Sequence, residues 1–158
     1  MRNKKFFIKN LLKILFIVLF CNNVNAADKY VGSGEMKLDD FDVEWFMKYL
    51  NPPAGQMPMT FFVLSENGEA IWSNYWYCPA GNCQTLSKKT ASEKCTAAAE
   101  KYHKRSIFEQ CKVFAQRRTI VWKNGTNPGR GKISKAKSKW NEKQLRDKLK
   151  ELGFFRLT

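Results

Sequence analysis

The first 26 residues have the composition of a secretory signal, and this decides how every later cysteine is interpreted. Residues 1–5 carry three basic side chains, residues 11–20 are apolar except for Lys13, and small residues precede and include Ala26. This pattern is typical of a signal peptide with its cleavage site. The apolar run is shorter than the roughly 18 to 20 residues of a spanning helix. We therefore expect cleavage after Ala26 and export to the periplasm or the cell exterior.

Removal of this segment leaves 132 residues and four cysteines in an oxidising compartment. That length supports one hydrophobic core, and an even number of cysteines in a small exported chain indicates two disulfides. Zinc is disfavoured because no two cysteines are separated by two residues and His103 is the only histidine. A lipid-modified Cys21 is disfavoured because the bulky Phe20 precedes it. The remaining cysteines are Cys78, Cys83, Cys95 and Cys111.

Four cysteines can pair in three ways, and the sequence leaves the three connectivities open. Geometry favours one of them. The segment between Cys78 and Cys83 is rich in turn-forming residues, and a turn can bring two Cα atoms within the roughly 4.4 to 6.8 Å that a disulfide requires. The other pair, Cys95 and Cys111, would then join a helix to the strand that follows it.

Charge is distributed unevenly along the chain. The net charge of +14 falls to +9 after cleavage, because five basic residues and no acidic residue leave with residues 1–26. Residues 27–100 hold 6 Lys and Arg against 10 Asp and Glu, whereas residues 101–158 hold 17 against 4. This asymmetry indicates either attraction between the two halves or a basic surface for an anionic partner.

Periodicity in the first half predicts a helix and a hairpin. Asp39 and Asp40 are good N-cap residues, apolar residues recur at helical spacing over 40–50, and two prolines follow. Strand-forming residues over 60–65 and 70–77 flank Asn67-Gly68, which is a strong hairpin turn signal.

The second half repeats this order. Residues 87–105 have a helical composition with a narrow face of small residues, and strands are expected over 111–116 and 119–122. Arg117-Arg118 lies between them and is poor chemistry for a two-residue turn, so a single long strand is the alternative. We predict an α+β domain over residues 27–122, in which two helices pack a small antiparallel sheet of two hairpins.

A basic segment and one more helix complete the chain. Residues 123–139 contain six basic residues, no acid and three glycines, which predicts a flexible linker. An amphipathic helix is expected within 140–158, because Asn141 and Gln144 have the spacing of a capping box and Gly153 suits a left-handed cap. We expect this helix to dock on the domain through Leu145, Leu149, Leu152 and Phe154.

The motif search predicts a protein without enzymatic activity, metal or cofactor. No nucleophile elbow, zinc-protease motif, redox cysteine pair or phosphate-binding glycine loop occurs in the sequence. The acids of 39–44 could bind calcium, but a capped helix start explains them better because aromatic residues continue the helix. His103 is expected to be exposed among lysines. An enzyme with a concealed site is our third hypothesis.

The basic segment carries our first functional hypothesis, which is binding to anionic surfaces such as lipid or lipopolysaccharide phosphates. A solvated lysine-rich linker is the alternative explanation. Sequence-specific nucleic-acid binding is disfavoured because no recognition helix or aromatic ladder accompanies the charge. The predicted binding residues are Lys123, Arg130, Lys132, Lys135, Lys137 and Lys139.

Aromatic residues in the second predicted strand carry the second functional hypothesis. Trp and Tyr can stack on sugar rings or form the centre of a protein interface at low entropy cost. Core packing is the alternative explanation. The residues are Trp72, Tyr75, Trp76 and Tyr77.

One part of the sequence resembles small exported bacterial domains of unknown function. The resemblance covers about residues 91–122 and rests on Ala91, Cys95 and Ala98, on Cys111–Ala115, and on Ile120-Val121-Trp122. It implies a disulfide between Cys95 and Cys111 and a location in the bacterial envelope. It implies no activity.

Overall fold

Helix α2 (Asp40–Leu50) shows how local sequence signals start an element of this fold. In the computed structural model, which describes residues 28–79 and 87–156, Asp39 accepts the backbone N–H of Asp42 at 2.8 Å. Asp42 accepts the backbone N–H of Asp39 at 3.3 Å in return. This reciprocal capping box satisfies two donors at the helix start, so the predicted bounds of 40–50 are confirmed. The expected signal segment lies outside the described residues.

Four antiparallel strands form one sheet in the order β2-β1-β3-β4. They are β1 (Gln56–Glu66), β2 (Glu69–Pro79), β3 (Lys112–Gln116) and β4 (Thr119–Ile120). Strands β1 and β2 are longer than predicted and meet at Asn67-Gly68, where both residues have positive φ, as the hairpin signal requires. The predicted α+β class with a small antiparallel sheet is confirmed.

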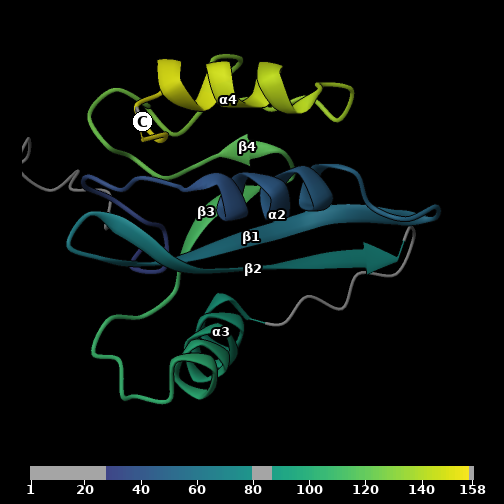
Figure 1. Cartoon of the computed structure of the whole chain (residues 1–158). Helices are drawn as coiled ribbons and strands as arrows, with labels where there is room; N and C mark the ends of the chain where they lie inside the picture. Colours follow the sequence, from purple (N-terminus) through teal and green to yellow (C-terminus); the bar gives the residue numbers. More distant parts are fainter. Residues whose placement is uncertain (1–27, 80–86, 157–158) are drawn as a thin grey trace, which may run out of the picture.

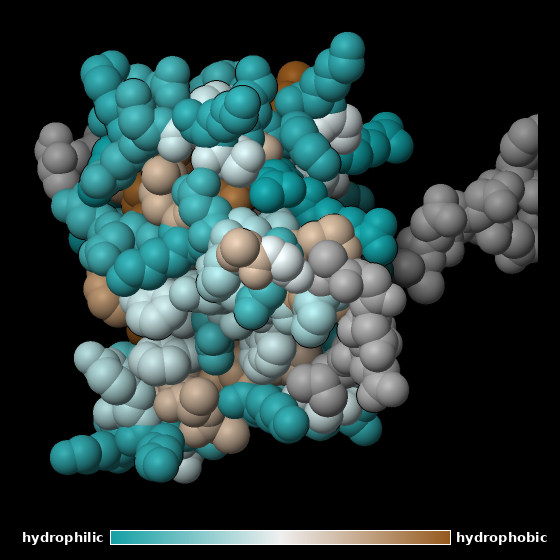
Figure 2. Space-filling view, turned by 90° about the vertical axis from the view of Figure 1, so that its right-hand side faces the viewer, coloured by the Kyte–Doolittle hydropathy of each residue, from teal (hydrophilic) through white to brown (hydrophobic). Residues whose placement is uncertain are grey.

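The sheet is covered on both faces by helices (Figure 1). Helices α2 and α4 (Glu142–Glu151) lie on one side and α3 (Lys88–His103) lies on the other. The larger apolar cluster fills the space beneath α2 and α4, and the smaller one lies beneath α3. Figure 2 shows hydrophilic residues gathered at the top of the molecule, where α4 lies.

A disulfide between Cys95 and Cys111 joins α3 to the segment that enters β3, with a Cα–Cα distance of 5.9 Å. This pair confirms one of the two predicted bridges. Cys78, in β2, is also disulfide-bonded, whereas its predicted partner Cys83 lies outside the described residues. The cross-link complements a helix face whose buried residues are small, including Ala91 and Ala99.

Helix α4 belongs to the main core. Its capping box is present, with Asn141 accepting the backbone N–H of Gln144 at 2.9 Å. The four residues predicted to dock the helix are all buried in the larger cluster: Leu145, Leu149, Leu152 and Phe154. After Gly153 turns with φ 76°, Phe154 accepts the backbone N–H of Leu38 at 2.8 Å. The expected docking on the chain's own domain is therefore confirmed.

The turn between β3 and β4 rules out the alternative of a single long strand through Arg117-Arg118. Arg117 and Arg118 form a two-residue hairpin turn with φ values of 45° and 69°, so they do not lie within one long strand. Left-handed backbone costs a non-glycine residue roughly 1 to 2 kcal/mol. Both arginines of this turn therefore carry that steric cost. Arg118 also contacts the end of α2, because its guanidinium donates to the carbonyl of Leu50 at 3.4 Å.

Candidate anion-binding site

Segment 123–139 packs against β4, which differs from the expected flexible linker. Asn127 and Ser134 are 1% and 0% exposed. The Asn127 amide donates to the carbonyls of Ile120 at 3.1 Å and Trp122 at 2.8 Å. Its oxygen accepts the Ser134 hydroxyl at 2.6 Å. The polar groups of this buried pair are therefore hydrogen-bonded, and the pair holds the middle of the segment against the domain.

Two backbone hydrogen bonds extend this attachment. Ile120 donates to the carbonyl of Ser134 and Ala136 donates to that of Arg118, each at 2.8 Å. Ala136 is buried in the main core. The segment is thus held to β4 and its turn along several residues. The backbone that carries the neighbouring lysines consequently follows a defined path along the surface.

Three of the predicted lysines converge on one groove. Lys132, Lys135 and Lys137 face α4 across an open depression of about 430 Å³. Helix α4 and the residue before its cap complete the lining with Trp140, Gln144, Asp147, Lys148 and Glu151. The ammonium group of Lys137 lies 5.9 Å from the centre of the Trp140 ring, which is a cation–π distance. A groove of this kind can hold a phosphate between ammonium groups.

The charges around this groove are only partly neutralised. Asp147 pairs with Lys143 at 3.0 Å and Glu151 pairs with Lys148 at 2.7 Å, so both acids already have cationic partners. In residues 28–79 and 87–156, none of the six predicted binding residues forms an ion pair with a carboxylate. All six are exposed. Their positive charge is therefore available to an anionic partner.

The other three predicted residues, Lys123, Arg130 and Lys139, do not line the groove. Sequence reasoning missed Arg117, which does not line the groove but adds an exposed cation at the turn, and whose carbonyl accepts the Lys135 ammonium at 3.2 Å. It also missed the contribution of α4. The helical spacing of Gln144, Lys148 and Glu151 could have indicated that face.

The four aromatic residues of the predicted binding strand do not form one face. Tyr75 and Tyr77 pack toward the larger cluster, and Trp72 and Trp76 pack toward the smaller one. Alternation along a strand explains the division. The tyrosines border an open depression at the end of α2, where the Tyr77 hydroxyl donates to the carbonyl of Lys48.

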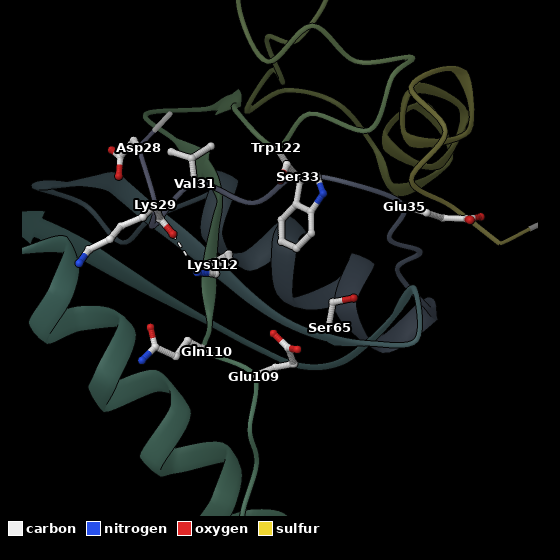
Figure 3. A pocket seen from close by; sticks show the side chains of 10 residues that line it. All are labelled: Asp28, Lys29, Val31, Ser33, Glu35, Ser65, Glu109, Gln110, Lys112 and Trp122. Carbon is white, nitrogen blue, oxygen red and sulfur yellow. Dashed lines mark hydrogen bonds between the residues drawn. The ribbon is translucent and has the colours of Figure 1, made fainter. Parts of the chain in front are cut away.

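A polar pocket near the start of the described chain has residues of both charges (Figure 3). Its volume is about 280 Å³, and Glu35, Glu109 and Lys112 are among its lining residues. Lys112 donates to the carbonyl of Lys29 at 2.8 Å. Asp28 pairs with Lys88, whose hydrogen bond lowers the pKa of Asp28. Because these charges are mixed and partly paired, we assign no chemistry to this pocket.

The sequence predicts an exposed His103, but this side chain is half-buried in the structure. Its Nε2 lies 3.0 Å from the carbonyl oxygen of Ile71, and its ring meets Trp72 at 6.3 Å. These contacts give it a structural role at the edge of the sheet. The residues that the structure describes contain no group of three or more metal-ligating side chains. They also contain no helix long and apolar enough to cross a membrane.

Comparison with known proteins finds no matching family model and no similar curated protein or solved structure.

Proposed function

We propose that this is a non-enzymatic exported protein whose basic groove binds phosphates on envelope lipids or lipopolysaccharide. The observation that carries the proposal is the convergence of Lys132, Lys135 and Lys137 beside α4. The buried Asn127–Ser134 pair holds their segment in place. A site organised before binding loses less entropy when it binds. The Cys95–Cys111 disulfide is compatible with an oxidising compartment outside the cytoplasm.

The expected contribution of the groove lysines to vesicle affinity is large enough to measure. A Lys or Arg near an anionic membrane contributes about 1 kcal/mol, so three groove lysines contribute roughly 3 kcal/mol. This corresponds to about a hundredfold in affinity, because 1.4 kcal/mol is a factor of ten. The attraction weakens with salt, since the Debye length falls from about 10 Å at 0.1 M to about 3 Å at 1 M.

Co-sedimentation with lipid vesicles tests the proposal. The mature protein should bind vesicles that contain phosphatidylglycerol, bind phosphatidylcholine vesicles weakly, and dissociate as salt rises. A second arm with lipopolysaccharide as competitor separates the two sources of phosphate. Replacing Lys132, Lys135 and Lys137 with Gln should lower affinity for the anionic vesicles about a hundredfold.

Helix α3 supplies a control with the same loss of charge. Lys89, Lys94 and Lys101 lie on this helix, and all three are exposed. The variant with these three lysines changed to Gln should keep most of the binding. Equal losses in the two variants would mean that net charge alone drives binding, and the groove proposal would fail.

Export and disulfide formation have a separate test. Intact mass of the protein recovered from outside the cytoplasm should correspond to a chain that begins at Ala27. Alkylation without reductant should modify none of its cysteines. A chain that retains residues 1–26, or one with four alkylated cysteines, would contradict the exported state on which the proposed partner depends.

A further inference from the structure

Aromatic side chains from three elements surround another cavity beside the edge strand β2. Phe41 and Trp45 come from α2, Trp72 from the edge strand β2, and Tyr102 from the last turn of α3. The cavity has a volume of about 260 Å³ and shares no lining residue with the basic groove. The rest of its wall is formed by Asp39, Asp42, Ala70 and Ile71.

Two of these rings remain largely exposed. Phe41 is 57% exposed and Tyr102 is 69% exposed. Each leans on a more buried indole: Phe41 meets Trp45 at 5.8 Å, and Tyr102 meets Trp72 at 5.0 Å between ring centres. Exposed aromatic surface that gathers around a cavity is a feature of binding sites. The cavity is therefore lined by aromatic surface from four residues.

The two indoles also have unsatisfied donors. The Nε1 atoms of Trp45 and Trp72 are buried and have no hydrogen-bond partner among residues 28–79 and 87–156. Buried N–H groups in folded proteins are nearly always paired. Both donors belong to residues that line this cavity, so a ligand that reaches them must supply acceptors.

Acceptors are also present in the wall. The carboxylates of Asp39 and Asp42 each accept one backbone N–H in the capping box, and a carboxylate can accept further hydrogen bonds. No Lys or Arg lines the cavity, so an anion would meet only like charge. The positive end of the α2 dipole and the capping bonds offset part of the cost of burying the Asp42 carboxylate without a cationic partner.

From these observations we propose that the cavity binds one neutral sugar ring. A sugar has apolar C–H faces for the aromatic rings, oxygen acceptors for the two indoles and hydroxyl donors for the two carboxylates. The volume lies just below the roughly 300 to 1,000 Å³ of pockets for drug-sized ligands, which suits a single ring. This inference is independent of the basic groove, and either one can fail without the other.

The indole N–H resonances of the five tryptophans provide the test by NMR. The full mature chain is titrated with glucose, galactose and N-acetylglucosamine, and each resonance is assigned with a Trp→Phe variant. At least one sugar should shift the Trp45 and Trp72 resonances saturably, with a dissociation constant in the millimolar range. Trp76, Trp122 and Trp140 do not line the cavity, so their resonances should stay in place.

Two exposed phenylalanines provide a matched pair of variants. Phe41→Ala removes an exposed wall of the cavity and should weaken sugar binding about tenfold. Phe108 is fully exposed and lies outside the cavity, so Phe108→Ala should leave the affinity unchanged. The circular dichroism spectra of both variants should match that of the parent chain.

Several results would overturn the proposal. These are the absence of any saturable shift with all three sugars, equal shifts at all five indoles, or equal losses in the two Phe variants. Tetramethylammonium chloride is the competing probe. If it shifts Trp45 and Trp72 and the sugars do not, the cavity takes an organic cation and the proposal of a sugar site is wrong.

Discussion

The two faces of this sheet are stabilised in different ways. Under α2 and α4, the rings of Phe46, Phe61 and Phe114 meet one another at 5.0 to 6.1 Å. Under α3, the helix buries only small side chains and is joined to the sheet by the Cys95–Cys111 disulfide. The first face depends on apolar area. The second face has a smaller apolar cluster and adds a covalent link.

Polar contacts add to the link on the α3 side. The Ser92 hydroxyl donates to the Cys111 carbonyl at 2.6 Å, and the Cys111 backbone donates to the Thr96 hydroxyl at 3.0 Å. Small side chains let the helix approach the sheet closely, but they bury little apolar area. We infer that the two faces respond to different perturbations. Removal of a ring should damage the first face, and removal of the cross-link should damage the second.

The largest expected effect is the loss of a central ring. Phe46→Ala should lower the free energy of unfolding by about 3 to 5 kcal/mol, because Phe46 is fully buried in the larger cluster. Urea denaturation followed by far-UV circular dichroism measures this. Phe41→Ala, on the same helix but exposed, should change stability by no more than about 0.5 kcal/mol. Similar losses in both variants would contradict the assignment of the core face.

Removal of the cross-link comes next. The double change Cys95→Ala with Cys111→Ala should cost about 3 kcal/mol, the value expected for a closed loop of roughly 15 residues. Amide hydrogen exchange localises the effect. Protection should fall in α3 and stay near its original level in α2 and α4. If α2 lost protection first, the disulfide would not act mainly on the α3 face, and the distinction between the two faces would be wrong.

A buried carboxylate at the start of α2 should make stability depend on pH. Asp42 is 3% exposed, and burial raises its pKa to about 6 from the usual 3.8. The folded state then binds more protons than the unfolded state between these two values. Its contribution to the free energy of unfolding should fall by about 2 to 3 kcal/mol as pH rises from about 4 to 7.

Asp42→Asn isolates this dependence from that of the other carboxyl groups. The neutral side chain cannot titrate, so the fall in stability between pH 4 and 7 should be smaller than in the parent chain by that amount. Urea midpoints at four pH values are sufficient. Parallel pH profiles for the two proteins would show that Asp42 has an ordinary pKa in the folded state.

The smallest expected effect separates stability from binding. Arg117 and Lys104 are both exposed cations in left-handed conformation, with φ values of 45° and 53°. Changing either residue to Gly should stabilise the fold by about 1 kcal/mol, because the steric cost at Cβ disappears. Only Arg117→Gly should weaken binding to anionic vesicles. Equal weakening by Lys104→Gly would show that Arg117 makes no specific contribution to anion binding.

Elements with strong local signals were predictable from the sequence. The capping box at Asn141 and the Asn67-Gly68 turn are decided by residues a few positions apart, so α4 and the first hairpin follow from local chemistry. The Arg117-Arg118 turn has no such signal. Contacts with Leu50 and with residues 134–136 hold it in place.

The arrangement of the sites was less predictable. The six basic residues could be identified from composition, but their attachment rests on Asn127 and Ser134, which are ordinary loop residues in sequence. The aromatic cavity combines residues from 39–45, 70–72 and 102. No sequence period relates these three segments. Trp72 was identified as a candidate, but its aromatic neighbours in the cavity come from α2 and α3 and were not identified.

The pairing of residues 37 and 38 with residues 153 and 154 has a consequence for the order of folding. Lys37 donates to the carbonyl of Gly153 and Leu38 to that of Phe154, each at 2.8 Å. A chain made from its N-terminus produces α2 more than a hundred residues before these partners appear. Until then, Val43 and Phe46 lack part of their cover and are open to aggregation. We therefore expect a newly made chain to depend on chaperones for most of its synthesis.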